Sequence, residues 1–245
     1  MTLLLTIYLM YVIMQTRILA LSMQQTNKNM GVKLYTLDLS PPARSVMMTC
    51  DLFNVPFEKI TVNLLEGDHL TPEFLKKNPL HTIPVLEDGD VTLHDSHAIM
   101  QYLADAYGKE DSWYPKDVKK RALVNQKLFF NISILFPRIR NITYPLIIEG
   151  NKNVDPKRYE DIAEAYGFVE EFLSRTTYLA ADHITIADVA ALSSMTSLEA
   201  LLPIDAKKFP KTTAWLTNLK KTSFSKNQNE SGATALGELI KKYLA

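Results

Sequence analysis

Between residues 33 and 107 the spacing of apolar residues switches between strand and helix patterns, in an order that restricts the fold strongly. Alternation and β-forming residues predict strands over residues 33–39, 59–64, 83–86 and 91–94, and helical spacing predicts helices over residues 43–53 and 96–107. This order is βαβ followed by ββα. It predicts a small mixed sheet covered by helices.

After residue 117 the pattern is helical only. Helices are predicted over residues 118–149, 156–174, 186–202, 212–221 and 233–243. A chain of 245 residues with 47% apolar content can bury two small cores. We therefore expect an α/β domain over residues 31–108, a linker over residues 109–116 and an all-α domain over residues 117–245.

Charge and cysteine content exclude several classes of partner. The 27 Lys and Arg residues balance 27 Asp and Glu residues, so neither nucleic acid nor an anionic membrane is expected as a partner. Cys50 is the only cysteine, so the chain can form no intrachain disulfide and no Cys-based zinc cluster. A reducing compartment, and hence a cytoplasmic location, is the natural interpretation.

Residues 1–30 do not follow the domain pattern and are not expected to belong to the fold. The first charged side chain is Arg17, and the apolar run before it is shorter than the ~20 residues of a membrane span. Three interpretations stay open: a signal-peptide core, a membrane anchor, or sequence upstream of a start at Met23 or Met30. The glycosylation acceptors Asn131 and Asn141 lie inside a predicted central helix, which argues against secretion.

Ser40 stands where the first strand ends and the first helix begins. Pro41 and Pro42 fit the first turn of a helix, so Ser40 is expected at the helix N-terminus, where the dipole and free N–H groups favour an anion. Ser40 could be a plain N-cap, or its hydroxyl could donate to a thiolate. Lowering a thiol pKa by about two units takes ~2.7 kcal/mol, and one hydrogen bond to a charged group supplies about 1.5–3 kcal/mol.

A second loop precedes the third strand. Pro84 cannot donate an N–H, and a cis Ile83–Pro84 bond would offer the N–H and C=O of Ile83 to a ligand's peptide group. His69 and His81 are either solvated loop residues or donors to a carboxylate of that ligand.

A third loop precedes the helix over residues 96–107. Ser96 is the expected N-cap, and its hydroxyl and the following N–H groups form an anion pocket. Asp95 beside it could accept from an α-ammonium group. The pair is either a zwitterion site or an ordinary helix cap.

Two patterns stand out in the helical half. Thr185 and Asp188 form a capping box that is expected to serve folding. Phe136, Ile139, Arg140 and Thr143 share one helix face; such a face is ordinarily core, but Arg140 suggests a partly open cleft.

Together these motifs resemble the insect cytosolic glutathione transferases, with the epsilon class first and the delta class next. The resemblance covers residues 32–245 and rests on Leu37-Asp-Leu-Ser-Pro-Pro-Ala-Arg44, Asn63-Leu-Leu-Glu-Gly-Asp-His-Leu70, Asn78-Pro-Leu-His-Thr-Ile-Pro-Val85, Asp95-Ser-His-Ala-Ile99 and Thr185-Ile-Ala-Asp188. It implies a thioredoxin-like domain, an all-helical domain and a homodimer with one glutathione site per subunit. Glutathione would be the cosubstrate, with no cofactor and no metal.

The resemblance also implies roles for single residues. Ser40 would stabilise the glutathione thiolate, and the other glutathione contacts would be His69, His81, Thr82, Ile83, Pro84, Asp95, Ser96 and His97. The electrophile site would be lined by Leu37, Pro42, Leu64, Phe136, Ile139, Arg140, Thr143 and Phe224. The chain departs from many relatives at Asn131, where they carry an acidic residue, and at His97, where delta members often carry Arg.

The implied activity is conjugation of glutathione to hydrophobic electrophiles, as in the detoxification of xenobiotics and in insecticide resistance. Glutathione-dependent dehydrochlorination is a second chemistry of such a thiolate. A thiol oxidoreductase would need a cysteine in place of Ser40. A carrier of hydrophobic ligands without catalysis is the remaining alternative.

Overall fold

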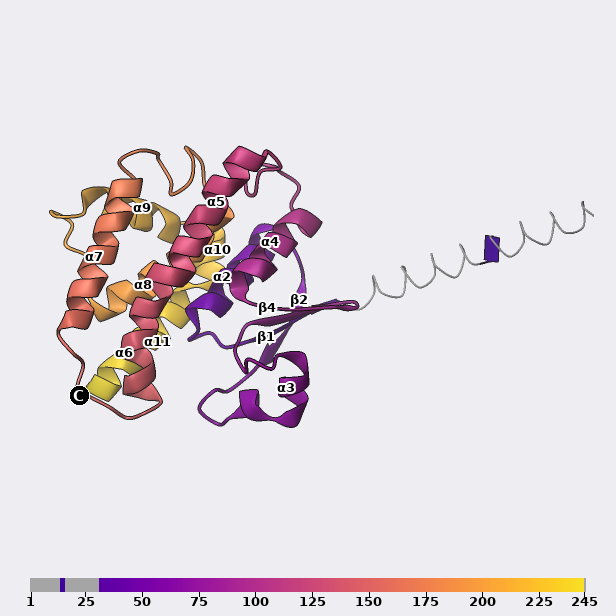
Figure 1. The fold of residues 1–245 in the computed structure, drawn as a ribbon, viewed down its shortest axis with the longest axis horizontal. Coiled ribbons are helices and arrows are strands. Elements are labelled where there is room, and N and C mark those ends of the chain that lie inside the picture. The colour runs from indigo at the N-terminus through magenta and orange to yellow at the C-terminus, as the bar shows by residue number, and fades with distance from the viewer. Residues whose placement is uncertain (1–13, 16–30, 245) are drawn as a thin grey trace, which may run out of the picture.

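The computed structural model describes residues 14–15 and 31–244 (Figure 1). The predictions made for residues 1–30, namely a signal, an anchor or upstream sequence, lie outside the described residues, apart from the helical pair 14–15. Within the described part, no helix is both long and apolar enough to cross a membrane.

The first half of the described chain forms the predicted mixed sheet. Its elements are β1 (Val32–Thr36), α2 (Pro41–Leu52), β2 (Phe57–Thr61), β3 (Val85–Asp88), β4 (Val91–His94) and α4 (Ser96–Tyr107). The strand order is β2-β1-β3-β4, with β1 parallel to β2 and antiparallel to β3. The βαβ and ββα order predicted from the sequence is confirmed.

The sheet register decides which loops lie close together. Val85, at the start of β3, pairs with Tyr35 near the end of β1 and with His94 at the end of β4. The chain therefore leaves β1, enters β3 and leaves β4 at one end of the sheet. The three loops predicted to carry ligand contacts all lie at this end.

A short helix between β2 and β3 was not predicted. The 3₁₀ turn η1 (Asp68–Leu70) leads into α3 (Pro72–Lys77), which Thr71 caps by accepting from the Phe74 N–H at 3.3 Å. Phe74 is buried against Val62, Ile83 and Val85 on one face of the sheet. Six residues are too few to show helical periodicity, and this explains the omission.

The rest of the chain is helical, as predicted (Figure 1). The helices are α5 (Val118–Phe130), η2 (Asn131–Leu135), α6 (Phe136–Ile147), α7 (Lys157–Phe172), α8 (Ile186–Leu201), α9 (Pro210–Lys220), α10 (Ser223–Gln228) and α11 (Glu230–Leu244). α8 is buried on every side from Ile186 to Leu198, so it forms the centre around which the others pack. α8 also packs on α2, which joins the two halves into one main core.

The single helix predicted over residues 118–149 is wrong in one detail, because a π-helical turn divides it. η2 has i→i+5 geometry, in which the Phe136 N–H donates to the Asn131 carbonyl. Pro137 has no N–H, so the regular α-helical bond at that position cannot form. π turns of this kind often occur at functional sites.

The predicted capping box at the start of α8 is confirmed. Asp188 Oδ2 accepts from the Thr185 N–H at 2.9 Å, and its Oδ1 accepts from Leu179 N–H and Trp215 Nε1 at 2.9 and 3.1 Å. The carboxylate thus joins three segments of the helical half, and its role is structural.

Candidate active site

Ser40 is the N-cap of α2, at the end of the sheet where the three loops meet. Its backbone is extended, with φ −81° and ψ 115°, and its Oγ accepts a long hydrogen bond of 3.4 Å from the Ala43 N–H. A hydroxyl that accepts through its oxygen still has its own hydrogen to donate. Ser40 is half-buried, so a ligand can reach that hydrogen.

The start of α2 offers fewer N–H groups to an anion than the sequence argument assumed. Pro41 and Pro42 occupy the first two helical positions and have no N–H. The next two N–H groups, of Ala43 and Arg44, donate to the Oγ and the carbonyl of Ser40. The expectation of free N–H donors here is therefore wrong, and the Ser40 hydroxyl is the donor that remains.

Arg44 fixes the turn that carries Ser40, a role that sequence reasoning missed. Its side chain is fully buried, and Nη1 donates to the carbonyls of Asp38 and Leu39 at 2.9 and 3.1 Å. Nη2 donates to Ser193 and Ser197 of α8, and Nε donates to Asn229 at 2.9 Å. Burial lowers the pKa of Arg44 to about 9, against the opposing effect of Asp38, so the guanidinium stays charged at neutral pH.

The loop before β3 presents a free peptide unit. The Ile83–Pro84 bond is cis. Within the described part of the chain, neither the N–H nor the C=O of Ile83 takes part in a backbone hydrogen bond. The buried Asn78 shapes this loop, because its Nδ2 donates to the carbonyl and hydroxyl oxygens of Thr82 at 2.8 and 3.0 Å.

His69 and His81 come together although they lie on different loops. Their ring centroids are 6.1 Å apart, and Nδ1 of His69 is buried without a hydrogen-bond partner among the described residues. Burial lowers the pKa of His69, His81 lowers it further, and Asp68 opposes both. A buried unpaired nitrogen beside an exposed histidine is consistent with a ligand carboxylate at this place.

Asp95, and not Ser96, is the N-cap of α4, which corrects the prediction. Asp95 Oδ1 accepts from the N–H groups of His97 and Ala98 at 2.8 and 3.2 Å. Its φ of 72° is uncommon for a residue with a Cβ, and such strain clusters at functional sites. Ser96 is the first helical residue and is buried, and its Oγ lies 3.5 Å from His97 Nδ1. Its own N–H donates to no backbone carbonyl of the described chain, so that N–H remains as an anion donor.

His97 links this loop to the helical half. Its Nε2 lies 3.0 Å from Nδ2 of Asn131 in the π turn, and its Nδ1 lies 3.7 Å from Asp95 Oδ1. His97 and Asn131 are both buried, with 6% and 5% exposure. An amide can present a donor or an acceptor, so Asn131 suits either neutral tautomer of His97, as a carboxylate could not.

Of the eight residues expected to line an electrophile site, six are half-buried or exposed and two are buried in the core. Leu37 and Leu64 are half-buried and pack against the cluster that contains Ile83. Leu39, which was not among the expected residues, lies next to Ser40 and packs against side chains of α6 and α11. Phe136, Thr143 and Pro42 are half-buried, and Arg140 is exposed with its guanidinium 4.4 Å from the Tyr144 ring centroid. Ile139 and Phe224 are only 2% and 5% exposed and belong to the main core, so we correct their assignment to core packing.

No group of three or more metal-ligating side chains occurs among residues 14–15 and 31–244. The polar groups at this end of the sheet are instead hydroxyls, backbone N–H groups, imidazoles and one carboxylate. This set fits a flexible organic molecule that carries carboxylate, ammonium and peptide groups.

Comparison with known proteins identifies the family. Residues 34–111 match the family model described as glutathione S-transferase, N-terminal domain, and residues 115–221 match glutathione S-transferase, C-terminal domain. Glutathione S-transferase 1 of Manduca sexta is 42% identical over 218 residues, which span 88% of this chain and 100% of that relative.

Solved structures similar to this chain belong to the same family. An epsilon-class glutathione S-transferase from the housefly, Musca domestica, superimposes with a TM-score of 0.85 at 45% identity, covering 86% of this chain and 98% of that one. A glutathione transferase homologue from Drosophila mojavensis with bound glutathione gives a TM-score of 0.85 at 41% identity, covering 87% and 97%. The predicted resemblance to the epsilon class and the predicted fold class, a thioredoxin-like domain followed by helices, are both confirmed. The chain belongs to the glutathione S-transferase family.

Proposed function

We propose that this enzyme adds the thiolate of glutathione to hydrophobic electrophiles, and that Ser40 stabilises the thiolate. The observation that carries the proposal is the sheet register, which places the loops of Ser40, Ile83 and Asp95 at one end of the sheet. The homologue from Drosophila mojavensis, which has bound glutathione, supports glutathione as the ligand.

Each part of the tripeptide has a matching group. The thiolate would accept from the Ser40 hydroxyl, whose oxygen already accepts from Ala43. The cysteinyl peptide unit would pair with the free backbone of Ile83, beside Thr82 and Pro84. The glycine carboxylate would meet His69 and His81.

The γ-glutamyl end needs one anion site and one cation site. Ser96 supplies an N–H and a hydroxyl to the α-carboxylate, and Asp95 has Oδ2 available for the α-ammonium, since both of its hydrogen bonds within the described chain use Oδ1. His97 lies behind them and is held by Asn131.

The electrophile would lie between the Ser40 turn and α6. The packing of Leu39 against α6 supports this place, and Leu37, Pro42, Leu64, Phe136, Arg140 and Thr143 are its candidate walls. The thiolate at this site could add to the electrophile or abstract a proton from it, and dehydrochlorination would follow the second course.

We further propose a homodimer through α5. Val118 and Phe129 are 77% and 65% exposed and lie three turns apart on one face of this helix. Two such exposed apolar side chains on one helix face are candidate contacts for the same face of a second subunit.

The function is tested by two measurements on wild type and Ser40→Ala. We expect calorimetry to detect glutathione binding to both, whereas turnover of 1-chloro-2,4-dinitrobenzene falls by at least about tenfold in Ser40→Ala, the loss of one hydrogen bond to a charged group. Ser174→Ala is the matched control, because it makes the same change at an exposed serine that follows α7 and is assigned to neither binding site. Wild-type binding without turnover of any electrophile would support the carrier alternative.

A further inference from the structure

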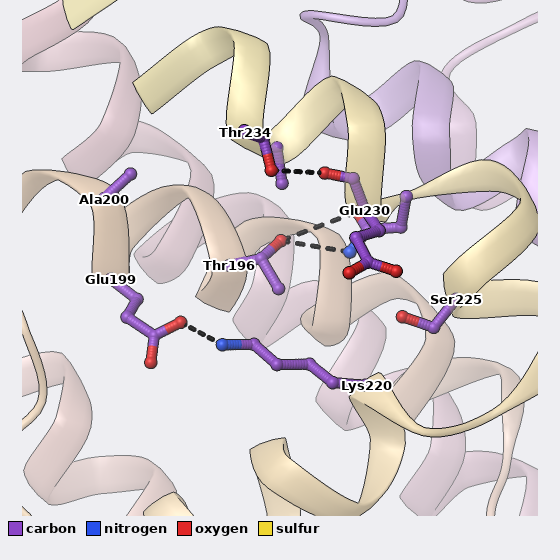
Figure 2. Close-up of a pocket in the computed structure, with 9 residues that line it drawn as sticks. Thr196, Glu199, Ala200, Lys220, Ser225, Glu230 and Thr234 are labelled. Carbon is purple, nitrogen blue, oxygen red and sulfur yellow. Dashed lines mark hydrogen bonds and ion pairs between the residues drawn. The ribbon is translucent and has the colours of Figure 1, made fainter. Parts of the chain in front are cut away.

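A cavity of about 340 Å³ lies among α8, α9, α10 and α11, and none of the residues assigned to the glutathione or electrophile site lines it (Figure 2). Its wall includes Glu199 of α8, Lys220 of α9, Ser225 of α10 and Glu230 of α11. The volume is near the lower end of ligand pockets, which span about 300–1,000 Å³. It therefore suits a small molecule.

The charges around the cavity favour a cation. Glu199 and Lys220 form an ion pair, so their opposite charges cancel. Glu230 is exposed and belongs to no ion pair with any described residue, which leaves the wall with one net negative charge. Figure 2 shows the carboxylate of Glu230 in the region bounded by Thr196 and Ser225.

A buried hydroxyl gives a second, independent sign of a ligand. Ser225 is only 1% exposed, and it lines the cavity; no hydrogen bond joins its hydroxyl to another residue of the described chain. A hydroxyl that faces a cavity and has no partner in the protein can bond to an occupant of that cavity, so Ser225 is a candidate ligand contact. The neighbouring Thr196 and Asn229 are already paired, with 3.3 Å between Asn229 Nδ2 and Thr196 Oγ1.

We propose that this cavity is a second ligand site, which binds a small molecule through a primary ammonium group. The ammonium donates to the Glu230 carboxylate and to the Ser225 hydroxyl oxygen. A metal ion fits less well, because no three metal-ligating side chains gather anywhere among residues 14–15 and 31–244.

The site is joined to the Ser40 turn by a chain of hydrogen bonds. Asn229, in the cavity wall, accepts from Arg44 Nε at 2.9 Å, and Arg44 Nη1 holds the carbonyls of Asp38 and Leu39 directly before Ser40. An occupant that shifts Asn229 therefore shifts the support of the turn. We expect occupancy to change glutathione affinity by about fivefold, the lower end of typical coupling between sites; this second part rests on the proposed function.

Calorimetry on the full-length protein tests the site without glutathione. The diamine cadaverine should bind, and a pentanediol of the same chain length should not. Glu230→Gln should weaken cadaverine binding about tenfold, the loss of one charged hydrogen bond. Lys220→Gln should tighten it, because Glu199 is released from its ion pair. Glu238→Gln is the matched control, with the same charge change on an exposed residue of α11 outside the cavity.

The outcomes separate the two parts of the proposal. Absence of cadaverine binding, equal binding of the diol, or equal weakening by Glu230→Gln and Glu238→Gln would overturn the site. Cadaverine binding with unchanged glutathione affinity would overturn the coupling alone. Cadaverine binding to a protein that takes up no glutathione would leave the second site standing and refute the proposed function instead.

Discussion

Nδ2 of Asn131, in the π turn of the helical half, lies 3.0 Å from Nε2 of His97, in the first turn of α4. This contact connects the helical half to the loop of Asp95 and Ser96 and helps to hold that loop in place. The position of Asn131 depends on the π turn, and the π turn depends on Pro137, which has no backbone N–H.

Asn131→Ala removes the partner of a buried imidazole nitrogen. We expect the free energy of unfolding to fall by about 1–3 kcal/mol, the usual effect of leaving a buried polar group unpaired. The KM for glutathione should rise more than kcat falls, because the substitution acts on the binding loop and not on Ser40. Urea unfolding and steady-state kinetics measure both effects. Asn141→Ala, at an exposed position in α6, is the control; equal effects of the two substitutions would refute the role of Asn131.

Gly232→Ala tests the contact between α11 and the Ser40 turn. A Cβ at this glycine would lie 2.8 Å from Cδ of Arg44 and 3.0 Å from the carbonyl carbon of Asp38, closer than atoms can approach without movement. We expect a loss of stability of about 1–3 kcal/mol, typical of overpacking, together with lower conjugation activity.

The control for that substitution is Gly167→Ala. Its Cβ would meet only Cε1 of Phe209, at an ordinary 3.8 Å, in the middle of α7. Replacing a mid-helix glycine should stabilise the protein by roughly 0.5–1 kcal/mol. Thermal unfolding of the two variants should thus shift in opposite directions. Unchanged stability of Gly232→Ala would show that the turn and α11 are not tightly packed.

The pKa of Asp95 predicts how the α4 cap responds to acid. The His97 side chain lowers the pKa of Asp95, burial opposes this, and the backbone N–H groups of Ala98 and His97 lower it further. The stabilisation is therefore complete above the ordinary aspartate value of about 3.9 and is lost as pH falls through the lower folded-state pKa. The stability difference between wild type and Asp95→Asn should be constant above about pH 5 and shrink below about pH 4. Thermal unfolding across this range measures it, and a difference that stays constant down to pH 3 would contradict the account.

Phe129→Glu tests the proposed dimer. A charge at the centre of an apolar interface should convert the dimer to a monomer at micromolar concentration, because the carboxylate cannot be hydrated there. Sedimentation velocity distinguishes the two forms. Ile148→Glu, at another exposed apolar side chain, should leave the dimer intact. A monomeric wild type would refute the interface directly.

Local patterns were sufficient to predict the sheet, the main helices, the capping box at Thr185 and the position of Ser40. Each of these depends on residues a few positions apart, so the sequence shows them directly. α3 is too short to show a period, and the π turn follows from one missing N–H that helical spacing does not reveal.

Other features depend on contacts distant in sequence. The burial of Arg44 could not be predicted, because its partners Ser197 and Asn229 lie more than 150 positions away. Asp95 and Ser96 are adjacent and both suit an N-cap; the positive φ of Asp95, which decides between them, is set by how β4 meets α4. Ile139 carries the same helical spacing as Phe136 whether that face meets core or cleft, so spacing alone could not separate them.

The central claim is that the Ser40 hydroxyl stabilises the thiolate of bound glutathione. The most direct measurement is a titration of the bound thiol by its ultraviolet thiolate absorbance, in wild type and in Ser40→Ala. We expect the wild-type complex to titrate about two units below the ordinary thiol value of about 8.5, and the complex of Ser40→Ala to return close to that value. An equally low thiol pKa in both complexes would contradict the account.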